Sequence, residues 1–204
     1  NGAAYAAAID GIIQLSREAG EFDAISGGET RDWDFSNPTA VALRKPHLKL
    51  YKDGRVLGAE IAGQTFLHVA DLNNEGSSVR DYWKPLIERH GGRLLGVISF
   101  VDRMEEGVDV LRNLGLRIFS VVPLDRHAWE TALAAGFVTR QLCDLLLERM
   151  RDRQVWAEQT LLENPEFFRK FYQAPNTRAK AERILKTYPA IAKQLQKIAE
   201  SDAD

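Results

Sequence analysis

Two hydrophobic patterns follow each other along the chain, and the change between them falls near residue 125. Before that point, short apolar or alternating runs, typical of strands, take turns with helical spacing. Strands are expected at residues 22–25, 47–51, 66–70, 94–101 and 118–124. Helices are expected at residues 3–19, 38–43, 79–90 and 107–114. This alternation predicts an α/β fold in which helices cover a parallel sheet.

After residue 124 the strand pattern stops and only helical spacing remains. Helices are expected at residues 129–135, 138–162, 165–172, 177–187 and 189–199. We therefore expect an α/β domain over residues 1–125 and an all-helical extension over residues 126–204. The extension should either pack on the core or form an oligomer interface.

Composition excludes several classes of protein. With 45% hydrophobic and 27% charged residues, the 204-residue chain is globular rather than disordered. A net charge of −2 creates no field that favours nucleic acid. No apolar run reaches the roughly 18 residues of a membrane span.

Cys143 is the single cysteine, which suits a reducing cytoplasm. The start, Asn1-Gly2, has neither a signal segment nor a Met, so we expect an origin inside a longer gene product or after a tag.

The stretch HVADLNNEGSSV, residues 68–79, has the composition of a strand that ends in a ligand-binding turn. In parallel sheets ligands bind at the carboxyl ends of strands, and the N-terminus of a following helix favours an anion. Asp71 could accept hydrogen bonds from ribose hydroxyls, and Gly76 would let the backbone approach a ligand. Ser77 and Ser78 offer hydroxyl groups. The alternative is a plain strand–turn–helix junction with a Ser or Asn cap.

A second candidate loop is SGGETRDWDFS, residues 26–36. Its candidate anion-binding residues are Gly27, Gly28, Thr30 and Arg31. Two glycines after a strand permit a tight turn toward an anion, and an arginine can bind phosphate in a bidentate manner. Trp33 or Phe35 could stack on a base. In the alternative, Arg31 pairs with Asp32 or Asp34 and Trp33 fills the core.

The histidines give no metal motif. His68 lies on an expected buried strand, where a core histidine with satisfied hydrogen bonds is the ordinary case. The other three histidines lack metal-ligand spacing, so no transition-metal site is expected.

These loops resemble those of the type I phosphoribosyltransferases, most closely the orotate phosphoribosyltransferases. The family's V-V-D-D strand and T-[TA]-G-[GT]-[ST] loop correspond to residues 68–71 and 74–78. Residues 57–63 resemble the approach to that strand, and residues 102–107 read D-R-M-E-E-G like the family's D-R-x-E-x-G turn. Residues 22–28 fall where the family keeps its pyrophosphate loop. The resemblance covers about residues 4–124 and leaves the helical extension unexplained.

The resemblance implies a type I phosphoribosyltransferase fold and a substrate, phosphoribosyl pyrophosphate (PRPP), that reacts with a nucleobase, orotate by resemblance. It also implies Mg²⁺, with Asp71 near the metal, and a homodimer, whereas the expected cytoplasmic location rests on the single cysteine. The implied catalytic residues are Lys52 and Asp71. The implied PRPP-binding residues are Gly27, Gly28, Thr30, Arg31, Asn73, Asn74, Glu75, Gly76, Ser77 and Ser78.

The sequence also departs from the family. The first acid of the family's pair is Ala70 here, and Glu75 places a carboxylate inside the phosphate loop. The family's R-K-E-x-K-x-H-G loop is shortened: Lys52 matches its first lysine, whereas its second lysine and its histidine have no counterpart. The S-G-x-x-S-P-Y-Y segment has no match. Two hypotheses follow, an orotate phosphoribosyltransferase-like enzyme or a non-catalytic PRPP- or nucleotide-binding or structural relative. A sugar-phosphate enzyme of other chemistry is a third.

Overall fold

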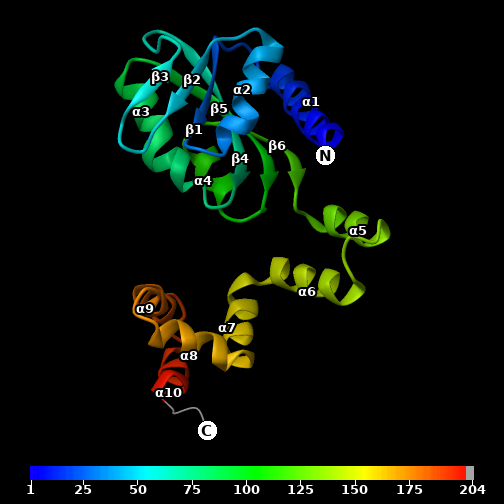
Figure 1. The fold of residues 1–204 in the computed structure, drawn as a ribbon, viewed down its shortest axis with the longest axis vertical. Coiled ribbons are helices and arrows are strands. Elements are labelled where there is room, and N and C mark those ends of the chain that lie inside the picture. Colours follow the sequence, from blue (N-terminus) through cyan, green and yellow to red (C-terminus); the bar gives the residue numbers. More distant parts are fainter. Residues whose placement is uncertain (201–204) are drawn as a thin grey trace. The chain divides into compact units, whose positions relative to one another are not determined.

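The computed structural model of the chain describes residues 1–200 and separates into two compact units, one from Asn1 to Ala128 and one that begins at Trp129. Figure 1 shows the elements of both units. Those of the first are α1 (Gly2–Glu18), β1 (Ala24–Gly28), α2 (Asp32–Leu43), β2 (His47–Leu50), β3 (Val56–Gly58), β4 (Thr65–Asn73), the π-helical turn η1 (Val79–Trp83), α3 (Lys84–Arg89), β5 (Arg93–Asp102), α4 (Gly107–Asn113) and β6 (Arg117–Pro123). The helices that follow are α5 (Arg126–Ala134), α6 (Arg140–Arg151), α7 (Arg153–Glu163), α8 (Pro165–Gln173), α9 (Arg178–Thr187) and α10 (Ala192–Glu200).

The first unit is built on a six-stranded sheet with the strand order β3-β2-β1-β4-β5-β6. All neighbouring pairs are parallel except β2 and β3, which are antiparallel. From β1 the chain builds outward to β2 and β3 on one side, and from β4 to β6 on the other. The strand order therefore switches between β1 and β4, the position at which open α/β sheets bind ligands. The predicted parallel sheet with covering helices is confirmed.

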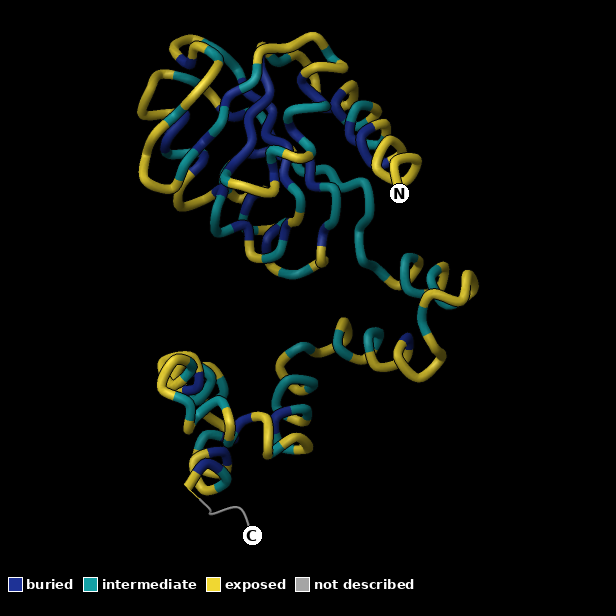
Figure 2. The backbone as a smooth tube through the Cα atoms, viewed as in Figure 1, coloured by how far each residue is buried: buried dark blue, intermediate teal, exposed yellow. Residues whose placement is uncertain are grey.

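Helices cover both faces of this sheet, because successive side chains of a strand point to opposite faces. In β4, Leu67 and Val69 pack against residues of α1 and α2, such as Ile12. On the other face Phe66 and Ala70 pack against residues of η1, α3 and α4. The buried positions in Figure 2 accordingly concentrate along the central strands. Burial on both faces explains why β4 and β5 read as nearly continuous apolar runs.

The two glycines of the second candidate loop are the last residues of β1, so the expectation that they form a turn after the strand is wrong. A Cβ on Gly28 would stand 2.4 Å from Trp83 Cε2, and one on Gly27 would stand 2.2 Å from Ser36 Oγ. Trp83 is almost completely buried. Glycine is thus required here by the close packing of η1 and α2 against β1.

Helix α2 begins at Asp32, six residues before the expected start, and it contains Pro38. Proline has no N–H to donate to the carbonyl four residues earlier, which is that of Asp34. The hydroxyl of Tyr5 on α1 donates to this carbonyl instead. A tertiary contact therefore compensates the bond that the proline removes.

Strand β3 was not expected from the sequence. It forms a hairpin with β2 through a turn in which Tyr51 N donates to Arg55 O at 3.0 Å. Asp53 holds the turn because it accepts from Arg55 Nε at 2.7 Å. The segment that resembles a shortened R-K-E-x-K-x-H-G loop is therefore a five-residue hairpin turn.

The second unit consists of helices around a small core of its own. Phe168, Ala181 and Leu195 form its centre. The single helix expected at residues 138–162 is wrong, because α6 and α7 are separated at Asp152. The Asp152 side chain accepts from Val155 N at 3.0 Å and so caps the start of α7.

Within residues 1–200, no helix combines the length and the apolar character needed to cross a bilayer.

His47 on β2 lies against α2, where its Nε2 is 2.9 Å from Ser36 Oγ. Burial, followed by the charges of Lys49 and His68, lowers the pKa of His47 to about 4. The fold therefore favours the neutral imidazole.

The low pKa of His47 predicts a pH dependence of stability. Between pH 6.5 and about 4 the unfolded chain takes up a proton that the folded chain does not, so stability falls as the pH falls through this window. In His47→Gln this fall should be shallower, because the titrating group is gone. Urea unfolding at several pH values measures it, and equal slopes in both proteins would contradict the assignment.

Gly28→Ala should destabilise the first unit by about 1–3 kcal/mol, because overpacking forces Trp83 or β1 to shift. Gly2→Ala is the matched control, since a Cβ there has nothing within 4 Å. The free energy of unfolding in urea is the measurement. A Gly28→Ala protein as stable as the control would show that the close approach of Trp83 does not constrain β1.

Candidate functional site

A cavity of about 250 Å³ opens at the carboxyl ends of β1 and β4, where the strand order switches. Its lining combines the loop after β4, the residues after β1, Lys52 from the β2–β3 turn and Trp83 from η1. The lining residues are Glu29, Arg31, Asp32, Lys52, His68, Ala70, Asp71, Leu72, Asn73, Asn74, Glu75, Gly76, Ser77, Ser78, Val79 and Trp83. The fold thus brings together the two loops that the sequence singled out.

Two glycines shape the loop after β4, one within the loop and one at the start of α4 that packs against it. Gly76 has φ +66°, a conformation that other residues rarely adopt. Gly107, the glycine of the D-R-M-E-E-G turn, lies beneath the loop and donates its N–H to Asn74 O at 2.9 Å. A Cβ on Gly107 would stand 2.5 Å from that same oxygen. Ser77 and Ser78 come directly before η1, where backbone N–H groups can face an anion.

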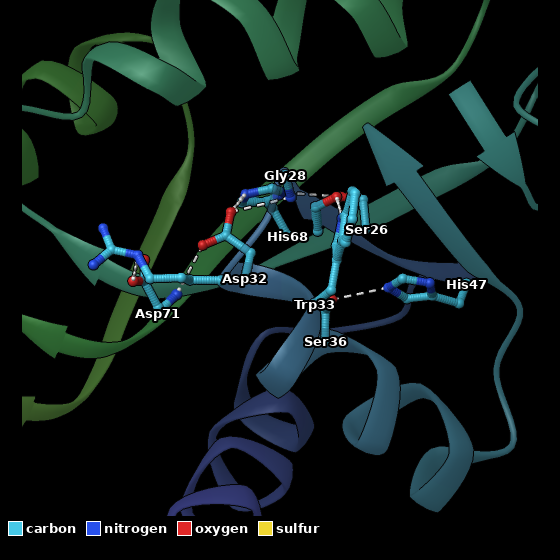
Figure 3. Close-up of polar contacts among 10 residues, drawn as sticks. Ser26, Gly28, Asp32, Trp33, Ser36, His47, His68 and Asp71 are labelled. Carbon is cyan, nitrogen blue, oxygen red and sulfur yellow. Dashed lines mark hydrogen bonds and ion pairs between the residues drawn. The ribbon is translucent and has the colours of Figure 1, made fainter. Parts of the chain in front are cut away.

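Asp32, the first residue of α2, joins the ends of the two strands (Figure 3). Its Oδ2 accepts from Gly28 N at 3.0 Å, and its Oδ1 accepts from Asp71 N at 2.9 Å. His68 Nε2 lies 3.4 Å from Oδ2, which is longer than a good hydrogen bond, so this contact is mainly electrostatic. One carboxylate therefore holds together β1, β4 and the start of α2.

The electrostatics of Asp32 are balanced by its neighbours. Burial alone would raise its pKa, but the contact with the His68 ring and the hydrogen bond from Asp71 N outweigh burial and lower it. Asp32 is therefore an ionised acceptor under a partly open cavity. His68 is completely buried, and its Nδ1 is 3.1 Å from Ser26 Oγ. The expected burial of His68 is thus found, but its Nε2 has no hydrogen-bond partner among the described residues, and the side chain also borders the cavity.

Asp71 carries an ion pair that the sequence did not suggest. Arg31 Nε lies 3.1 Å from Asp71 Oδ2, so Arg31 pairs with Asp71 and not, as in the structural alternative, with Asp32 or Asp34. The Arg31 side chain is 81% exposed, which leaves its outer N–H groups within reach of a ligand. Burial and the charge of Asp32 raise the pKa of Asp71, and the guanidinium of Arg31 acts in the opposite direction.

Asn73 lines the cavity, but it belongs to the end of β4 rather than to the loop. It is the last residue of β4, it is buried, and its Nδ2 donates to Asp102 Oδ2 at 2.6 Å. Asp102 also accepts from Met104 N at 2.6 Å. Although Asn73 borders the cavity, its side-chain amide ties β4 to the turn after β5 rather than facing a ligand.

Three expected site residues, Gly27, Gly28 and Thr30, do not line the cavity. Gly28 N donates to Asp32, and Gly27 O accepts from Trp33 Nε1 at 2.9 Å, so these backbone groups already have partners. Trp33 meets Tyr51 edge-on with ring centroids 5.1 Å apart, which fits packing better than base stacking. The peptide bond between Glu29 and Thr30 is cis.

Lys52 and Glu29 stand together at the cavity. Lys52 N donates to Glu29 Oε1 at 2.7 Å, and Lys52 Nζ lies 5.7 Å from the centre of the Tyr82 ring. Glu75 borders the cavity and is exposed. Lys52 and Arg31 are therefore positive groups at this cavity, which is also lined by the carboxylates of Glu29, Asp32, Asp71 and Glu75.

Sequence reasoning did not nominate Asp32, Glu29, His68 or Trp83 as site residues. A usable signal was present for Asp32. A histidine on a buried strand needs a polar partner, and Asp32 follows the neighbouring strand. Trp83 gave no such signal, because an apolar residue in a helix looks the same whether or not it borders a cavity.

Mg²⁺ was expected from the resemblance. Within the part of the chain that the structure describes, no group of three His, Cys, Asp or Glu residues could hold a metal. Mg²⁺ commonly keeps several waters and is held by one or two carboxylates together with substrate phosphates. These residues therefore fit Mg²⁺ as an ion that arrives with a phosphorylated ligand, with Asp71 as the candidate carboxylate.

Comparison with known proteins gives phosphoribosyltransferases as relatives of the chain. The adenine phosphoribosyltransferase of Acetivibrio thermocellus is 30% identical over 115 residues, which cover 46% of this chain and 67% of the relative. The orotate phosphoribosyltransferase of Pyrobaculum aerophilum is 32% identical over 109 residues, which cover 50% of this chain and 56% of the relative. The matched part of the chain thus spans 67% of the length of the first relative and 56% of the length of the second. No family model matches the chain.

Among solved structures, the UMP synthase of Leishmania donovani has a similar fold. Its TM-score is 0.65 at 16% identity, and the match covers 72% of this chain and 32% of the other. At this identity the similarity supports the fold alone. The shared fold is consistent with the strand order of the sheet described above. Sequence relatives and fold together lead to one conclusion: the chain belongs to the type I phosphoribosyltransferase family.

Proposed function

We propose that the chain binds PRPP in the cavity between β1 and β4 and transfers its phosphoribosyl group to a nucleobase, orotate first, in nucleotide biosynthesis. The observation that supports this most is the convergence of the loop after β4, Asp71, Arg31 and Lys52 on one cavity at the strand switch. Relatives named for orotate and for adenine favour a nucleobase as the acceptor.

Each part of the cavity has a role in this proposal. Backbone N–H groups and hydroxyls of residues 74–78 hold the 5′-phosphate at the start of η1. Asp71 accepts hydrogen bonds from the ribose. Arg31 and Lys52 face the diphosphate, where positive charge stabilises the leaving group. Mg²⁺, when bound with PRPP, neutralises further diphosphate charge.

In the proposed reaction the bond between ribose C1 and the diphosphate oxygen breaks, and its electron pair leaves with the diphosphate. A ring nitrogen of the base then forms the new bond to C1 and gives up its proton to solvent. The protein's contribution is chiefly to position the two reactants and to neutralise charge. A cytoplasmic location and a homodimer remain part of the proposal.

One observation favours the non-catalytic alternative. The turn that carries Lys52 is a five-residue hairpin held by the Asp53–Arg55 pair, and it offers no second lysine or histidine to close over the diphosphate. Together with Glu75 in the phosphate loop, this feature suits a protein that binds a nucleotide or sugar phosphate without transfer.

Calorimetric titration of the full chain with Mg²⁺-PRPP tests the proposal. The wild type should bind, and Asp71→Ala should bind at least about tenfold more weakly, because it loses hydrogen bonds to a charged acceptor. Glu75→Gln should bind roughly fivefold more tightly, since a carboxylate about 4 Å from a phosphate charge costs roughly 1 kcal/mol in water. Glu21→Gln, an equal charge change at an exposed position outside the cavity, should bind like the wild type.

Binding by the wild type then makes turnover assays with orotate and with adenine decisive for the acceptor. Absence of binding in the wild type, together with binding gained in Glu75→Gln, would overturn the enzyme proposal in favour of the non-catalytic alternative. Absence of binding in both proteins would remove PRPP from this cavity.

A further inference from the structure

Two carboxylates from different elements meet at the floor of the cavity. Asp71 comes from β4 and Asp32 from the first turn of α2. The backbone N–H of Asp71 donates to Asp32 Oδ1 at 2.9 Å, so the two side chains border the same small region. Ala70 lines the cavity next to Asp71, at the position where the family's motif has its first acid.

Asp32 has acceptor capacity to spare. An ionised carboxylate offers about four lone-pair sites. Gly28 N engages Oδ2 and Asp71 N engages Oδ1, while His68 Nε2 lies 3.4 Å from Oδ2, beyond a good hydrogen bond. The Asp32 carboxylate also interacts with the Asp71 side chain, and 12% of its side-chain surface stays exposed, so a donor from the cavity can reach it.

The Asp71 carboxylate also has acceptor capacity that its protein partners leave unused. Its Oδ2 is engaged by Arg31 Nε, and 22% of its side-chain surface stays exposed, so part of its acceptor capacity remains for a ligand. An uncharged sugar presents hydroxyl donors on neighbouring carbons, and ionised carboxylates are strong acceptors for such donors. Adjacent acceptor oxygens from two aspartates suit a pair of neighbouring hydroxyls.

We infer that Asp32 and Asp71 together accept hydrogen bonds from two neighbouring hydroxyls of the sugar, with Asp32 supplying from α2 the acid that β4 lacks at Ala70. This inference rests on the proposed function and deepens it, because it assigns a substrate-binding role to a residue outside the family's motif. In the competing explanation Asp32 is a structural clamp only, and the ribose is held by Asp71 alone.

Relocating the acid distinguishes the two explanations. The proteins to compare are wild type, Asp32→Asn, Ala70→Asp, the double variant Asp32→Asn/Ala70→Asp and the double variant Asp32→Asn/Ala70→Asn. Asp34→Asn is the matched charge control, because Asp34 lies on the same helix turn but is exposed and outside the cavity. Mg²⁺-PRPP affinity is measured by calorimetry, and thermal unfolding checks each fold.

Asp32→Asn should bind PRPP about 10- to 100-fold more weakly, the range expected when a hydrogen bond to a charged acceptor is lost. Adding Ala70→Asp to this variant should restore at least tenfold of the affinity, whereas adding Ala70→Asn should not. Ala70→Asp alone should bind no better than wild type, since a third carboxylate would stand beside an occupied pair. Asp34→Asn should bind like wild type.

Two results would overturn the inference. One is an Asp32→Asn protein that folds and loses affinity but is not rescued by Ala70→Asp. The other is an Ala70→Asp single variant that binds at least tenfold more tightly than wild type, which would mean that the site lacks an acid. The second result can be obtained even if Asp32→Asn fails to fold. If the wild type itself does not bind PRPP, the proposed function fails rather than this inference alone.

Discussion

The site depends on the buried carboxylate of Asp32. It accepts hydrogen bonds from the last residue of β1 and from Asp71 of β4, and it lies against the His68 ring. β1 and β4 are paired strands at the switch in strand order, and this carboxylate adds a link between the two ligand-facing loops that follow them. A buried charge is tolerated only when it is paired and hydrogen-bonded, so these contacts are also a condition for the fold.

The packing around Asp32 explains several residues that look like ligand-binding signals in the sequence. Gly28 is a glycine because Trp83 packs against β1, and its N–H already serves Asp32. Asn73 is polar because it ties β4 to Asp102. A motif can thus mark a ligand-binding region correctly while some of its polar and small residues serve the framework. The residues that remain for a ligand are Asp32, Asp71, Arg31, Lys52 and the loop at residues 74–78.

The sequence predicted the architecture of the first unit well, because burial on both faces of a parallel sheet leaves apolar runs that local patterns reveal.

The prediction from sequence failed where contacts between residues far apart in the chain determine the local structure. The start of α2 was missed because Tyr5, far away in sequence, satisfies the carbonyl that Pro38 leaves free. Strand β3 was missed because three residues give too short a pattern. The break at Asp152 was missed because a capping aspartate can also occur within a helix. Asp32 was seen only as a partner for Arg31, since its contacts come from residues of two separate strands.

The departures of this chain from its family now have places in the structure. Ala70 leaves β4 one acid short beside Asp32, Glu75 adds an exposed negative charge at the phosphate loop, and the β2–β3 turn is a short hairpin. Amide NMR of the ¹⁵N-labelled chain during titration with Mg²⁺-PRPP is the most direct test that the Asp32 junction forms the ligand site. The shifts should concentrate at residue 52 and at residues 29–32 and 71–78. Shifts confined to other parts of the chain, or saturation without change at these amides, would contradict it.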